Sequence, residues 1–135
     1  NLAARFEFME TVQQTAIGWL TTFSAATLEE MLRTCETWGK SKNEEWNLLL
    51  DFLETWFRDL TWLHHGLPEE KLINRTINSG DSRISALRNS AEHFNLQQIH
   101  EIFDRIAESR RAIELNANKS LAVESLCLHI YRRAA

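Results

Sequence analysis

The chain has 135 residues, of which 44% are hydrophobic and 25% are charged, with four glycines and one proline. This size suits a single domain with its own core, and the composition excludes a disordered or low-complexity protein. Residues that break helices or shape hairpins are too scarce for a β-sandwich or β-barrel. We therefore expect one all-α domain spanning residues 1–135.

Charge is distributed unevenly along the chain. Residues 1–70 carry 5 basic and 12 acidic side chains, whereas residues 71–135 carry 10 basic and 7 acidic ones, and the net charge is −4. The basic excess in the second half is too small for binding dominated by nucleic-acid phosphates. We expect no direct nucleic-acid binding.

The cellular setting is indicated by the cysteines and by the hydropathy. Cys35 and Cys127 each lie in an apolar helical pattern, which favours buried free thiols in a reducing cytosol. No apolar run has the length of a membrane-spanning helix, and the first residues do not form a signal peptide. We expect a cytoplasmic location without membrane contact. Because the chain begins at Asn1 inside a helical pattern, we expect a fragment of a longer protein.

Hydrophobic periodicity predicts six helices, which we expect to pack as a single compact bundle. Their expected bounds are about 2–21, 27–38, 44–65, 82–93, 95–115 and 119–133. Asn43 is the expected N-cap of the third helix, and Asp81 or Ser82 that of the fourth. Asn95, with Gln98 three residues later, matches a capping box for the fifth.

The third predicted helix is the most apolar segment of the chain. Apolar side chains cover so much of its circumference that neighbours must pack on several sides, and we expect it at the centre of the domain. In the second helix, the residues expected to face inward are Leu28, Met31, Leu32 and Cys35. The predicted structural core consists of Trp46, Leu50, Leu53, Trp56, Phe57, Leu60, Phe103, Ile106, Leu121 and Leu128.

Three polar residues are predicted to be buried, namely Asp59, Asn118 and Glu124. A carboxylate beside covered helix faces needs a partner, which Arg110, Arg111 or Asn118 could supply to Asp59. A surface location for Asp59 is the alternative.

Residues 66–81 form the one long connection and contain the proline and two of the glycines. A connection of this length in a compact domain is typical of contact sites. Leu67, Leu72, Ile73 and Ile77 are expected to hold it against the helices.

Sequence motifs of catalysis and of metal binding are missing. The chain has neither a phosphate-binding loop nor a nucleophile elbow. His100 and Asp104 would share a helix face, but the second histidine of a zinc-protease motif is not there. We expect no catalytic residue, cofactor, metal or small-molecule ligand.

The five tryptophans allow two interpretations. They fill the core, or at least one covers a surface that another protein contacts, because aromatic residues are enriched at the centres of interfaces. Trp62 is the tryptophan that we predict at such an interface. The predicted interface also includes the basic residues Arg110, Arg132 and Arg133.

Three segments carry a resemblance to a known family. They are Trp56-Phe57-Arg58-Asp59-Leu60, Leu72-Ile73-Asn74, and the segment from Asn116 to Leu126, which reads N-A-N-K-S-L-A-V-E-S-L. In this order and spacing they resemble the C-terminal domain of the bacterial DNA polymerase III clamp-loader family. The 72–74 segment favours the delta-prime type over the tau/gamma type.

This resemblance implies a helical collar domain. In the family, five such domains pack in a ring and hold ATPase modules below it, and the assembled loader places a sliding clamp on primed DNA. The expected partners are the delta and tau/gamma subunits, and an ATPase-type region is expected N-terminal to this domain. The domain itself is expected to be non-catalytic.

Two other classes of function remain open at this point. The first is a free-standing helical adaptor or regulator that binds an amphipathic partner helix. The second is an enzyme that binds its ligand in a helix-lined pocket.

Overall fold

The computed structural model describes residues 2–22, 27–40, 42–74, 83–116 and 118–134. Over these residues the chain forms six α-helices and one short 3-10 helix, without strands, which confirms the predicted all-α class. The elements are α1 (Leu2–Thr22), α2 (Leu28–Gly39), α3 (Asn43–His64), η1 (Glu69–Lys71), α4 (Ile84–His93), α5 (Leu96–Glu114) and α6 (Lys119–Ala134). The predicted bounds differ from these by only one or two residues.

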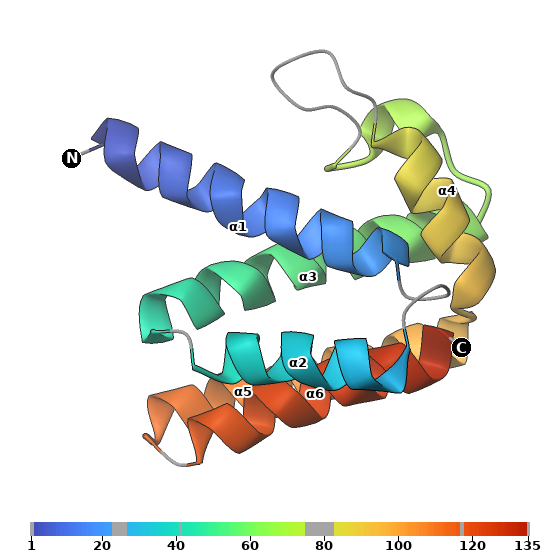
Figure 1. The fold of residues 1–135 in the computed structure, drawn as a ribbon. Helices are drawn as coiled ribbons and strands as arrows, with labels where there is room; N and C mark the ends of the chain where they lie inside the picture. The colour runs from blue at the N-terminus through green and yellow to red at the C-terminus, as the bar shows by residue number, and fades with distance from the viewer. Residues whose placement is uncertain (1, 23–26, 41, 75–82, 117, 135) are drawn as a thin grey trace.

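The helices pack around α3 and α6 (Figure 1). Helix α3 contacts α5, α4 and α1, while α6 lies between α5 and α2. In the view of Figure 1, α2 is drawn between α3 and the α5–α6 pair, and Trp46 Nε1 at the beginning of α3 donates to Trp38 O at the end of α2. Helix α4 covers the C-terminal part of α3 (Figure 1).

Helix α3 supplies the centre of the core, as its apolar pattern predicts. Trp56 and Phe57 are fully buried, and the Phe57 ring meets the Phe94 ring edge-on with 5.2 Å between centroids. Of the predicted core, Phe103 and Leu128 are half-buried and pack against the buried cluster. The predicted core residues that are buried are Trp46, Leu50, Leu53, Trp56, Phe57, Leu60 and Ile106.

Leu121 is not a core residue, because 58% of its surface is exposed. The buried face of α6 is centred on Val123, Leu126 and Ile130. Successive helical residues are rotated by about 100°, so Leu121 lies about 160° away from Val123 around the helix axis. Leu32 on α2 was likewise expected inward and is 47% exposed. The predicted inward orientation is therefore wrong for Leu121 on α6 and for Leu32 on α2.

Asn118 is exposed, in contrast to the prediction that it is buried. Its backbone oxygen accepts a hydrogen bond from the Ala122 N–H at 3.1 Å, at the beginning of α6. A residue that precedes the first helical turn is beside solvent, and its side chain needs no buried partner. Glu124, which was also predicted to be buried, is half-buried on α6.

Helix caps explain most of the element bounds. The capping box of α5 is confirmed, since Asn95 and Gln98 each bind the other's backbone N–H. Asn43 is not the cap of α3, because the helix already begins there and Lys42 occupies the cap position. The Asn43 side chain instead accepts a hydrogen bond from Lys119 Nζ at 3.0 Å. The predicted caps of α4, residues 81 and 82, lie outside the described residues.

The turns after α3 and α5 use residues in the left-handed region. Gly66 has φ of 67°, its N–H bonds to Leu63 O, and Leu67 N–H bonds to Trp62 O. This pair of bonds is a Schellman motif, which favours glycine at this position. Asn116 has φ of 51° after α5, a conformation that asparagine tolerates better than most residues. The predicted turn at residues 116–118 therefore begins at Asn116.

Replacement of Trp56 by alanine tests the central position of α3. We expect Trp56→Ala to lower the free energy of unfolding by about 3–5 kcal/mol, because the indole leaves a cavity between packed helices. Leu121→Ala is the control and should cost less than about 0.5 kcal/mol, since its side chain is exposed. Urea unfolding followed by circular dichroism measures both, and equal stability of the two variants would contradict this placement.

Candidate protein-interaction surface

Residues that could carry chemistry are spread over the described part of the chain. Within residues 2–22, 27–40, 42–74, 83–116 and 118–134, no three His, Cys, Asp or Glu side chains are grouped to hold a metal ion. His100 and Asp104 are exposed on α5. In the same ranges, no helix has both the length and the apolar content needed to cross a membrane.

Asp59 is the most deeply buried carboxylate of α3, with 2% of its surface exposed. Its Oδ1 accepts the Ile73 N–H at 2.9 Å, and its Oδ2 accepts the Asn74 N–H at 2.8 Å and Asn74 Nδ2 at 3.0 Å. The predicted burial is thus confirmed, but the predicted partners are wrong. Backbone and amide donors of residues 73 and 74 satisfy the carboxylate, in place of an arginine or Asn118.

The segment 66–74, which we call the return loop, runs back along α3 after the Gly66 turn. Trp62 Nε1 donates to Pro68 O at 2.8 Å, and Asn74 Nδ2 also donates to Thr55 Oγ1 at 3.2 Å. Trp62, Asp59 and Thr55 are spaced by three and four residues, so they line one face of the helix. The return loop is therefore fixed to α3 over two turns.

Side-chain burial in the return loop differs from the prediction. Leu72 is buried, as expected, whereas Leu67 and Ile73 are 40% and 47% exposed. The backbone N–H of Ile73, and not its side chain, holds this residue to α3. Ile77 lies outside the described residues.

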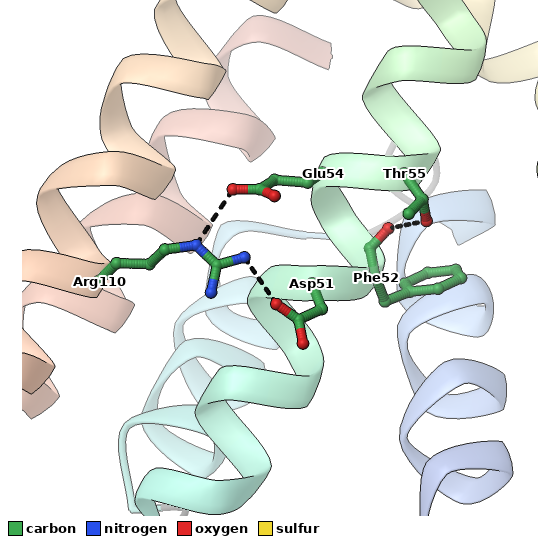
Figure 2. A network of polar contacts seen from close by, with 5 residues as sticks. All are labelled: Asp51, Phe52, Glu54, Thr55 and Arg110. Carbon is green, nitrogen blue, oxygen red and sulfur yellow. Dashed lines mark hydrogen bonds and ion pairs between the residues drawn. The ribbon is translucent and has the colours of Figure 1, made fainter.

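Arg110 joins α5 to the N-terminal half of α3 (Figure 2). Its Nε donates to Glu54 at 3.0 Å and its Nη2 to Asp51 at 2.8 Å, whereas Phe52 and Thr55 point to the other side of the helix. Burial of the guanidinium lowers the pKa of Arg110, but the hydrogen bonds and charges of Glu54 and Asp51 outweigh this effect and raise it overall. Arg110 therefore bridges two carboxylates of its own chain.

The other predicted interface residues differ in exposure. Trp62 is half-buried, because its ring lies along the return loop, and Arg132 is exposed near the end of α6. The side chain of Arg133 lies outside the described part of the chain. The structure does not bring Trp62, Arg110 and Arg132 into one cluster through any contact among the described side chains. Their role at an interface stays a prediction.

A groove of about 400 Å³ lies between α2 and α6. The residues that line it are Glu29, Leu32, Arg33, Glu36, Glu124 and Leu128. Arg33 Nη2 pairs with Glu29 at 3.4 Å along α2. The groove thus has leucines from both helices and acidic side chains around them.

The sequence interpretation missed this groove and four buried polar residues, namely Asn74, Arg83, Ser90 and Ser109. Asn74 belongs to the Leu72–Asn74 motif, and an asparagine after an apolar pair in a loop is a signal for a buried hydrogen bond. Arg83 is buried over the Phe52 ring at 6.0 Å, and this desolvation lowers its pKa, with the charge of Glu10 opposing. No local pattern identifies Arg83, because its burial depends on the packing of α4 against α3 and α1.

The Asp59 contact can be measured by substitution. We expect Asp59→Ala to lower the free energy of unfolding by roughly 2–4 kcal/mol, because buried N–H donors lose their charged acceptor. Asn74→Ala should cost less, since the backbone donors of residues 73 and 74 remain. The double variant should be less destabilised than the sum of the singles by at least about 0.5 kcal/mol. Asp104→Ala, at an exposed position of α5, is the control, and an equal loss in it and in Asp59→Ala would contradict this account.

The Arg110 bridge should respond to salt. We expect Arg110→Gln to cost about 0.5–1 kcal/mol in low salt and less in 1 M NaCl, because ions screen partly exposed pairs. Arg111→Gln, at the exposed neighbouring position, should leave stability unchanged. Urea unfolding at both salt concentrations measures the difference. A loss for Arg110→Gln that does not depend on salt would show that the arginine acts through its aliphatic stem.

Comparisons of the chain with protein families, with curated proteins and with solved structures gave no match. The functional interpretation consequently depends on the arrangement described above and on the motif resemblance in the sequence. Three features matter for it. They are the return loop on α3, the Arg110 bridge, and the groove between α2 and α6.

Proposed function

We propose that this chain is a non-catalytic subunit-interaction domain of a bacterial DNA polymerase III clamp loader, of the delta-prime type. In this proposal it packs beside the collar domains of the delta and tau/gamma subunits in the cytoplasm. It holds the ring of subunits together while the loader places a sliding clamp on DNA. ATP chemistry belongs to other regions of the complex.

One observation carries the proposal, namely that two of the motifs behind the resemblance form a single contact. Asp59 comes from the Trp56–Leu60 motif and Asn74 from the Leu72–Asn74 motif, and their atoms are joined by hydrogen bonds of 2.8 and 3.0 Å. Two motifs that are separate in the sequence but hydrogen-bonded to each other in the structure support common descent of this chain with the clamp-loader family better than two unconnected matches would. The six-helix fold agrees with the helical collar that the resemblance implies.

A second candidate is a helical adaptor that binds a partner helix. The groove between α2 and α6 favours it, because Leu32 and Leu128 line a surface between two helices. A third helix fits such a surface in the helix-in-groove mode of recognition. The two candidates differ in the identity of the partner, since the adaptor requires no clamp-loader subunits.

Co-expression with the delta and tau/gamma subunits of the same source tests the first candidate. We expect the chain to co-purify with them as a stable complex, with each contact burying on the order of 800 Å² per partner. No complex with either subunit would contradict the clamp-loader assignment.

A charge reversal in α6 tests the predicted basic interface. We expect Arg132→Glu combined with Arg133→Glu to slow association and to reduce its dependence on salt, because charges at the rim of an interface steer encounter. Arg105→Glu, at an exposed position of α5, is the control. Surface plasmon resonance at two salt concentrations measures the rates, and unchanged rates in the α6 variant would refute this interface.

A further inference from the structure

The surface formed by α2 and α6 has apolar side chains beyond those that line the groove. Leu121 precedes Leu128 by seven residues, which is two helical turns, so both lie on the same side of α6. Leu32 of α2 and Leu128 of α6 line the groove, and Leu32 and Leu121 are 47% and 58% exposed. A line of leucines along two packed helices is complementary to the i, i+3, i+4 and i+7 anchors of a third helix.

The charge of the same surface favours a partner of opposite charge. Three glutamates line the groove, Glu29 and Glu36 from α2 and Glu124 from α6. Arg33 is the one basic residue among the lining residues that the structure describes, and it pairs with Glu29 at 3.4 Å. Glu36 and Glu124 thus bring like charges to the two walls of a partly apolar groove. A cationic group placed between them would relieve this repulsion.

We infer that the α2–α6 groove binds a basic amphipathic helix of a partner protein. Leucine-like side chains of that helix would cover Leu32, Leu121 and Leu128, and its lysines or arginines would lie beside Glu36 and Glu124. The inference rests on the second candidate function and deepens it by naming the charge of the partner helix, and it does not depend on the clamp-loader proposal. It also assigns a role to Leu32 and Leu121, which are exposed and do not belong to the core.

Two synthetic peptides test the chemistry of the occupant directly. One is an amphipathic helix of leucines and lysines, and the other has the same leucines with glutamates in place of the lysines. We expect the 135-residue chain to bind the lysine peptide at least about tenfold more tightly, measured by isothermal titration calorimetry at physiological salt. Absence of binding to the lysine peptide, or equal binding of both peptides, would overturn the inference.

Matched variants show whether the peptide occupies this groove. Leu32→Ser and the pair Glu36→Lys with Glu124→Lys should each weaken binding by about tenfold. The controls are Leu96→Ser, at a leucine of α5 with 42% exposure, and the pair Glu108→Lys with Glu114→Lys on the exposed side of α5. The controls should change binding less than about twofold, and circular dichroism should show that all variants fold. Equal losses in groove and control variants would place binding elsewhere and refute the inference.

Sedimentation distinguishes a partner helix from a second copy of the chain. We expect the groove variants and the unmodified chain to sediment alike. A dimer of the unmodified chain that the groove variants convert to monomers would show that the groove is covered by another copy, and would overturn the inference. These outcomes are independent of clamp-loader subunits, so failure of the co-purification experiment leaves this test intact.

Discussion

The buried carboxylate of Asp59 is the constraint that determines the path of the return loop along the C-terminal half of α3. A charged group with 2% exposure is tolerated only when hydrogen-bond donors surround it, and residues 73 and 74 supply three of them. The return loop must therefore run back along α3 so that residues 73 and 74 lie beside Asp59. Gly66 makes the reversal possible, because its left-handed conformation begins the loop directly after the helix.

Position along antiparallel helices explains why Arg110 binds Asp51 and Glu54 and not Asp59. Helices α3 and α5 run in opposite directions (Figure 1), so the end of α5 lies beside the first half of α3. Arg110 is near the end of α5 and meets residues 51 and 54 there. Asp59 lies about two turns further along α3 from Asp51, at the level where the return loop supplies donors.

Much of the fold could be predicted from the sequence, because helix periodicity and capping are local properties. The capping box at Asn95 and the apolar face of α3 depend on residues three or four positions apart. The outward direction of Leu121 could not be predicted, since α6 has apolar residues on several sides and its neighbours decide which are buried. The hydrogen-bond partners of Asp59 could not be predicted either, because every residue except proline has a backbone N–H and the sequence does not show which one binds.

The packing of α2 has a consequence for the order in which the chain folds during synthesis. Helix α2 packs mainly against α6, although residues 40–118 separate the two helices in the sequence. The ribosome must synthesise the chain through α6 before α2 meets this neighbour, whereas α3 and α4 can meet as soon as α4 is complete. Contacts between such distant segments slow folding, because a long loop closes before they form. We therefore expect the contacts around α3 to form before those between α2 and α6.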